Sequence, residues 1–120
     1  MSKFVKLIFA AALVAASTAA FAHAQLQDSV PPVGGTVASD SQVRLHFSEG
    51  VEPSFSSISL KDSGGADVAH GKAAVDPSDN AVLIVKTNAP LAPGAYTVSW
   101  KAVSVDTHHT QGTFQFTVKP

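Results

Sequence analysis

Apolar and polar residues alternate in short runs along most of the chain. Between residues 43 and 47, Val43, Leu45 and Phe47 alternate with polar neighbours, and this period of two is typical of a β-strand with one buried face. Clusters of Gly, Pro, Asp and Ser separate the runs, as expected of turns. Seven segments fit a strand: 43–47, 57–61, a weaker one around Val68, 72–75, 81–86, 96–102 and 114–118.

These segments predict an all-β fold, because no segment after the first 22 residues shows a helical period over 10 residues. The segment 81–86 is apolar on both faces, so we expect it at the centre of a sheet. Tyr96 stands near the start of a strand with Val98 two residues later, as in the tyrosine corner of immunoglobulin-like domains, and Val98 occupies the position of the disulfide cysteine. We predict an immunoglobulin-like Greek-key β-sandwich of about seven strands.

The first residues have the pattern of a secretory signal peptide. Lys3 and Lys6 precede an apolar run at 7–16, and small residues follow it. The run is too short and too rich in alanine for a membrane span, so we expect a mature protein that is not membrane-embedded. Cleavage after Ala22 and cleavage after Ala24 both fit the A-x-A rule. We favour the first, which gives a signal peptide at 1–22 and one domain at 23–120.

Composition argues against several classes of function. Without Lys3 and Lys6, the chain has six basic and nine acidic residues, and the basic residues do not cluster in the sequence. This argues against nucleic acid as a partner. The chain has no cysteine, so we expect no disulfide, and any metal site must use nitrogen and oxygen ligands. Neither an ordered Ser/His/Asp spacing nor a Gly-rich phosphate loop occurs, so we do not expect an enzyme.

The candidate chemistry lies in the stretch 105–112. In an extended segment, residues two apart point to one face, so Asp106 and His108 can converge on one metal ion. Cleavage after Ala22 would make His23 the first residue, which offers its α-amine and its ring Nδ1 to the same ion. Three nitrogens and one oxygen suit tetragonal Cu(II), which binds more tightly than other first-row divalent ions in the Irving–Williams order.

A simpler interpretation stays open, because a polar loop can carry a D-x-H sequence by chance. The other histidines fit ordinary roles. We interpret His46, which points outward on its strand, and His70, in a loop without methionines, as exposed histidines. His109 faces away from His108 in an extended segment, so we expect it to contact solvent or a hydrogen-bond partner.

Several motifs together carry a resemblance to a known family. They are His23 at the predicted mature start, the S-x-P-x-x-G turn at 29–34, L-H-F-S-E-G-V-E-P at 45–53, P-G-A-Y-T-V-S-W at 93–100, V-S-V-D-T-H at 103–108 and G-T-F at 112–114. With these motifs the chain resembles, along essentially its whole mature length, the CopC family of periplasmic copper-resistance proteins.

The resemblance implies a small β-sandwich that binds one Cu(II) per chain in the periplasm. It assigns the copper ligands to the amine and ring of His23, to Asp106 and to His108. It also puts the Glu49 carboxylate near the copper, either supporting the ligands or as a distant or water-mediated ligand. Some family members add a Cu(I) site in a methionine-rich loop. Here the only methionine is Met1, so we expect Cu(II) alone.

Three functions remain open. We favour a monomeric carrier or buffer that holds Cu(II) for copper resistance or homeostasis and passes it to a partner, such as an inner-membrane copper transporter of the CopD type. The second is a metal-free immunoglobulin-like adhesion or assembly module. The third is a small oxidative copper enzyme, since a histidine brace also occurs in lytic polysaccharide monooxygenases. Asp106 argues against the third, because it would help to fill the plane that oxygen chemistry needs open.

Overall fold

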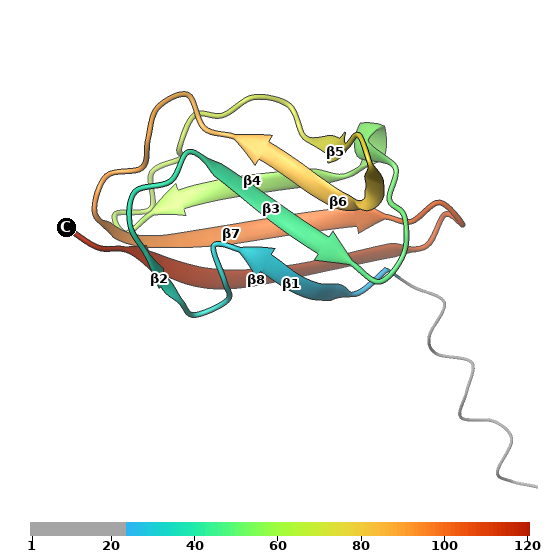
Figure 1. Cartoon of the computed structure of the whole chain (residues 1–120), viewed down its shortest axis with the longest axis horizontal. Coiled ribbons are helices and arrows are strands. Elements are labelled where there is room, and N and C mark those ends of the chain that lie inside the picture. Colours follow the sequence, from blue (N-terminus) through green and yellow to red (C-terminus); the bar gives the residue numbers. More distant parts are fainter. Residues whose placement is uncertain (1–23) are drawn as a thin grey trace, which may run out of the picture.

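Two four-stranded sheets pack face to face in the computed structural model, which describes residues 24–120 (Figure 1). One sheet has the order β1-β3-β6-β5 and the other the order β2-β8-β7-β4. The elements are β1 (Leu26–Val30), β2 (Thr36–Val37), β3 (Gln42–Phe47), the 3₁₀ turn η2 (Pro53–Phe55), β4 (Ser57–Asp62), β5 (Ala74–Asp76), β6 (Asp79–Lys86), β7 (Gly94–Val103) and β8 (His109–Val118). This architecture confirms the predicted all-β sandwich. Residues 24–120 include no helix with the length and apolar character of a membrane span.

Most of the predicted strands are present, but one is absent and two others were missed. The strand expected around Val68 is wrong: its N–H donates to the Leu60 carbonyl at 3.0 Å, but Val68 belongs to no strand. The alternation missed β1, which a register shift between Leu26 and Asp28 interrupts, and β2, which has only 2 residues. The described residues therefore form eight strands, close to the predicted number of about seven.

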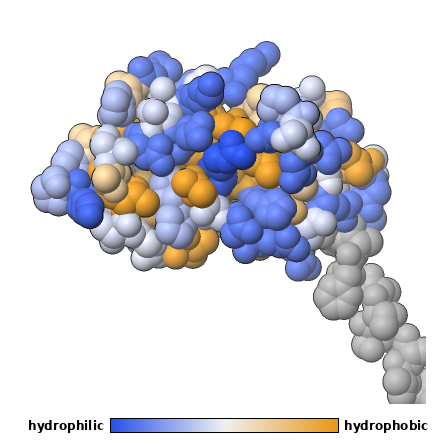
Figure 2. Space-filling model, in the orientation of Figure 1, coloured by the Kyte–Doolittle hydropathy of each residue, from blue (hydrophilic) through white to orange (hydrophobic). Residues whose placement is uncertain are grey.

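The inward-facing residues of both sheets form one hydrophobic core. Buried positions alternate with more exposed ones along β3, β7 and β8, as the period of two predicts. Phe47 and Trp100 meet edge to face across the two sheets, with ring centroids 5.1 Å apart, and Tyr96 stacks on Phe116 at 5.5 Å. On the face that Figure 2 shows, hydrophilic side chains surround small, separate apolar areas.

Two further predictions are confirmed. The Tyr96 hydroxyl donates a hydrogen bond to the Ala92 carbonyl at 2.6 Å, which is the tyrosine corner of immunoglobulin-like domains. Val98, at the cysteine position, is fully buried. The apolar strand β6 lies between β3 and β5, so both of its edges are paired and it is an inner strand of its sheet.

One end of the sandwich gathers three chain segments. The β7–β8 ladder runs without a break from the Gly94–Val118 pair to the Val103–His109 pair, so the loop 104–108 closes this hairpin at one end of the molecule. Strand β3 ends and β1 begins at the same end (Figure 1), where Leu26 pairs with Phe47. The loop that the sequence singled out therefore projects beside the first described residues.

Candidate metal centre

The loop 104–108 is a tight turn and not the extended segment that the sequence analysis assumed. The Ser104 N–H donates to the His108 carbonyl at 2.9 Å, and the Thr107 N–H donates to the Ser104 carbonyl at 2.8 Å. Thr107 has a φ of 74°, a left-handed conformation that a β-strand cannot contain. The premise that Asp106 and His108 share a face through strand alternation is therefore wrong.

The two side chains nevertheless lie together. His108 Nδ1 is 3.2 Å from Asp106 Oδ1. Both side chains remain accessible, with exposed fractions of 48% for His108 and 43% for Asp106. The turn thus presents a carboxylate and an imidazole, side by side and open to solvent.

The Ser104 hydroxyl is hydrogen-bonded to both residues of this pair. Ser104 is fully buried, and its hydroxyl donates to Asp106 Oδ1 and accepts a hydrogen bond from the His108 N–H at 3.2 Å. The hydrogen bond from Ser104, and after it the His108 ring, lower the pKa of Asp106 below its ordinary value, although partial desolvation opposes them. Asp106 is therefore an anionic oxygen donor at neutral pH.

His23, the third predicted ligand, lies outside the described residues, as does the predicted signal peptide at 1–22. The described chain begins at Ala24, which is completely buried. The Ala24 carbonyl accepts a hydrogen bond from the Thr110 hydroxyl at 2.9 Å, two residues after His108. Gln25 and Ser48 are joined twice, since the Gln25 N–H donates to Ser48 Oγ and the Ser48 N–H donates to the Gln25 carbonyl, each at 2.8 Å.

Glu49 lies on the loop that follows β3, at the same end of the sandwich. Its neighbour Gly50 accepts a hydrogen bond from the Val105 N–H at 3.0 Å, and Val51 forms a β-bridge with Ser104. These contacts fix the loop of Glu49 against the turn that carries Asp106. The role expected for the Glu49 carboxylate near the copper stays a prediction.

The other histidines lie elsewhere. His46 Nδ1 is 3.0 Å from Asp28 Oδ2 on the outer face of the β1–β3 pair, and His70 Nδ1 is 2.8 Å from the Gly71 carbonyl oxygen. His109 is the exposed first residue of β8. Among residues 24–120, no three His, Cys, Asp or Glu side chains come together as a metal site, so Asp106 and His108 form an incomplete donor set.

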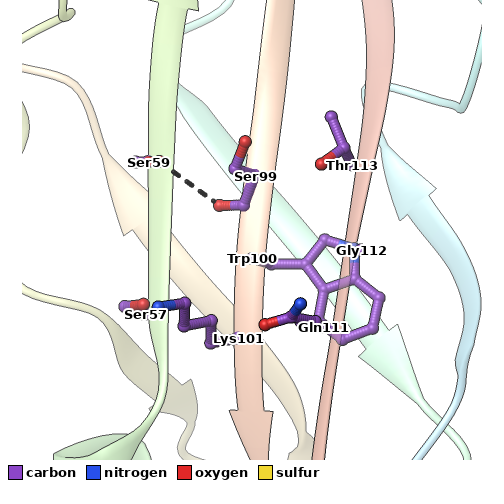
Figure 3. A pocket seen from close by; sticks show the side chains of 8 residues that line it. All are labelled: Ser57, Ser59, Ser99, Trp100, Lys101, Gln111, Gly112 and Thr113. Carbon is purple, nitrogen blue, oxygen red and sulfur yellow. Dashed lines mark hydrogen bonds between the residues drawn. The ribbon is translucent and has the colours of Figure 1, made fainter.

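A separate hollow of about 320 Å³ lies on the outer face of the β4–β7–β8 sheet (Figure 3). Lys101, Gln111 and the hydroxyls of serine and threonine line it, and the Trp100 ring lies beside Gly112 at its base. No carboxylate or imidazole lines the hollow, so it offers nothing to a divalent metal ion.

The sequence analysis missed Ser104 and Thr110. A signal for Ser104 existed, because a serine two residues before Asp106 is typical of side-chain hydrogen bonding within turns. Thr110 had no such signal, since its partner Ala24 is far away in the sequence.

Comparison with known proteins identifies the family. A family model described as CopC domain matches residues 26–119. The chain belongs to the CopC family. Among its CopC relatives, copper resistance protein C of Pseudomonas syringae pv. tomato is 35% identical over 123 residues, which cover 98% of this chain and 96% of that protein. The resemblance found in the sequence is confirmed.

Two solved structures share the CopC fold. PcoC from Escherichia coli, described as a methionine-rich copper resistance protein, gives a TM-score of 0.75 at 36% identity and covers 82% of this chain and 100% of its own. CopC from Methylosinus trichosporium OB3b gives a TM-score of 0.75 at 37% identity, over 82% and 95% of the two chains. In contrast to PcoC as described, this CopC-family chain contains one methionine, Met1.

Proposed function

We propose that this CopC-family protein binds one Cu(II) per chain and acts in the periplasm as a copper carrier or buffer for copper resistance or homeostasis. The observation that carries the proposal is the Asp106–His108 pair, held 3.2 Å apart and exposed at the end of the sandwich where the described chain begins. The copper is cargo that the protein holds and passes on, for instance to an inner-membrane copper transporter of the CopD type.

The separation of the pair supports a shared metal ion. Nitrogen and oxygen ligands of first-row metals lie at about 2 Å, so two ligands at right angles on one ion are about 2.8 Å apart. The Nδ1–Oδ1 distance of 3.2 Å is close to this value. Small side-chain rotations would bring both atoms into a common coordination sphere.

The remaining donors in this proposal are the α-amine and ring of His23. Ala24 is hydrogen-bonded to Thr110, two residues from His108. Because consecutive Cα atoms are about 3.8 Å apart, a residue directly before Ala24 is within reach of this part of the molecule. The burial of Ala24 also supports cleavage after Ala22, because cleavage after Ala24 would remove a core residue as well as His23. Three nitrogens and one carboxylate favour Cu(II) over Zn(II).

Copper titration of the mature protein tests the proposal. We expect one Cu(II) per chain and an electron paramagnetic resonance spectrum with three nitrogen ligands. Asp106→Asn and His108→Ala should weaken binding by orders of magnitude, measured in competition with a chelator. Since the amine and imidazole must lose protons to bind, affinity should also fall steeply below about pH 6.

His46→Ala and His70→Ala serve as matched controls, because these histidines lie outside the proposed site, with their ring nitrogens at Asp28 and Gly71. Both should bind copper like the unchanged protein. A chain whose affinity falls on His70→Ala and survives His108→Ala would contradict the assigned site. A folded mature protein without copper affinity would instead favour a metal-free module.

A further inference from the structure

An amino-terminal ligand poses a physical problem that an internal ligand does not. A chain terminus has one covalent neighbour and is poorly ordered unless other contacts hold it. If His23 supplies two of the four copper ligands, as in the function proposed above, the ordering of the terminus sets much of the affinity. The residues that hold the first peptide groups after His23 are therefore of interest.

Two hydroxyl side chains, one on β8 and one directly after β3, hold these peptide groups. Thr110, on β8, donates to the Ala24 carbonyl at 2.9 Å. Ser48, directly after β3, accepts from the Gln25 N–H at 2.8 Å, and its own N–H donates to the Gln25 carbonyl at 2.8 Å. We call the contacts of Ala24 and Gln25 with Thr110 and Ser48 the amino-terminal clamp.

The position of Thr110 is unusual for a hydroxyl. It alternates in phase with Gly112 and Phe114 on β8, so it points to the inner side of the sheet, where the next side chains are part of the core. A hydroxyl on an inner face needs a hydrogen-bond partner, and the Ala24 carbonyl provides it. The buried methyl group of Ala24 adds apolar contact at the same point.

The clamp also lies where the regular ladder of β1 is interrupted. The pairing of β1 with β3 shifts register between Leu26 and Asp28, as at a β-bulge, and such a shift changes the direction of the strand. The contacts of Gln25 with Ser48 resume the pairing beyond this shift. The clamp thus holds Gln25 and Ala24 beyond the point at which the β1 ladder is interrupted.

We propose that Thr110 and Ser48 are positioning residues of the copper site, which hold Ala24 and Gln25 so that the amine of His23 meets Asp106 and His108. The inference rests on the proposed function but concerns residues that do not bind the metal. It predicts that the terminus is pre-ordered before copper arrives, so the clamp can be tested in metal-free protein as well.

Thr110→Val is the sharpest test, because valine keeps the β-branched shape and removes only the hydroxyl. In metal-free protein, amide hydrogen exchange at Gln25 should become about fivefold faster, as expected for the loss of one hydrogen bond. Cu(II) affinity should fall about 10- to 100-fold, the usual effect of removing a group that orients a ligand. The paramagnetic resonance spectrum should show fewer nitrogen ligands.

Three further variants decide between positioning and general destabilisation. Thr110→Ser keeps the hydroxyl and should restore affinity and spectrum. Thr113→Val changes an exposed threonine on the same strand and should alter neither. Ser48→Ala removes the acceptor of the Gln25 N–H from the other side and should reproduce the loss seen with Thr110→Val.

The outcomes separate this inference from the proposed function. If Thr110→Val and Ser48→Ala bind copper like the unchanged protein while Asp106→Asn does not, the clamp is wrong and the site stands. Equal losses in Thr110→Val, Thr110→Ser and Thr113→Val would also overturn the clamp, since they would report only a weakened β8. If Asp106→Asn and His108→Ala keep full affinity, the proposed site itself fails.

Discussion

Ser104 illustrates how a single buried hydroxyl fixes the geometry of two exposed side chains. It hydrogen-bonds the Asp106 carboxylate and the His108 N–H at once, and its backbone closes the turn through His108 and Thr107. Because these bonds are local, the pair needs no metal ion to come together. The two residues are therefore pre-organised for a ligand that requires both.

A second carboxylate, Asp76, is held by several hydrogen bonds at the turn between β5 and β6. It accepts hydrogen bonds from the Ser78 N–H and hydroxyl, each at 2.8 Å, and from the Arg44 guanidinium at 2.9 Å. These contacts, the Ser78 backbone first, lower the pKa of Asp76 from 3.8 to about 2. The interactions of the Asp76 carboxylate thus stabilise the folded state.

The lowered pKa of Asp76 predicts a pH-dependent contribution to stability. A carboxylate with a lower pKa in the folded state stabilises the fold above its unfolded pKa, and this stabilisation is lost as pH falls through the folded value. Asp76→Asn should therefore lower the urea midpoint of unfolding at pH 7. The difference from the unchanged protein should shrink between about pH 4 and pH 2.

Asp67→Asn is the matched control for this measurement. Asp67 is 82% exposed and lies 3.7 Å from Lys61, so its ion pair should contribute little at any pH. A deficit of Asp76→Asn that is equally large at pH 7 and pH 2 would show that the charge of Asp76 is not its source.

The β7–β8 hairpin is the element that carries the candidate site. Its ten residue pairs include Trp100 with Gly112 and, at the end next to the turn, Val103 with His109. The strand register therefore defines which residues form the turn. A one-residue slip would turn every side chain of the hairpin to the opposite face. The position of Asp106 and His108 therefore depends on packing along the full length of the hairpin.

Gly112→Ala tests this dependence at its tightest point. A Cβ atom on Gly112 would lie 2.6 Å from Cζ2 of Trp100, whose ring packs against Phe47 and cannot move freely. We expect a loss of about 1–3 kcal/mol in the free energy of unfolding, typical of overpacking. Urea denaturation of metal-free protein measures it.

Gly71→Ala provides the comparison, since a Cβ atom there would meet only the Lys86 carbonyl oxygen, at 4.0 Å. This variant should unfold at nearly the same urea concentration as the unchanged protein. Equal stability of the two variants would mean that the Trp100 ring does not constrain the hairpin.

For the molecule as a whole, the proposed site joins segments from both ends of the sequence. Ala24 and Thr110 are 86 positions apart and share a hydrogen bond, while the loop after β3 lies beside Val105. The site therefore requires the folded sandwich, and in the proposed function it also requires a free amine at His23. Signal-peptide cleavage would then create the complete donor set.

A protein with one extra residue before His23 tests that requirement. Its fold should be unchanged, because the core of Phe47, Trp100 and Phe116 is untouched. It should lose much of its Cu(II) affinity, because the amine of His23 becomes an amide, and its paramagnetic resonance spectrum should show fewer nitrogen ligands. Unchanged affinity and an unchanged spectrum would contradict amine ligation and would leave Asp106 and His108 with other partners.

The sequence by itself determined the fold class, most strands, the tyrosine corner and the family. Each rests on local information: period-two alternation reports which face of a strand is buried, and Tyr96 reaches Ala92 only 4 positions upstream. The strands it missed, β1 and β2, are those in which a register shift or a length of 2 residues hides the period. The sequence also singled out Asp106 and His108, although it assigned them the wrong backbone conformation.

Only the tertiary structure decided how these side chains are held. Ser104 had to be buried under the turn before its hydroxyl could join Asp106 to His108, and burial depends on both sheets. Thr110 on β8 had to face Ala24, which precedes β1, although β1 and β8 belong to different sheets. Such contacts leave no periodic trace, because the partner of each hydroxyl is chosen by packing and not by sequence spacing. The residue types were readable from the chain; their mutual orientation was a property of the fold.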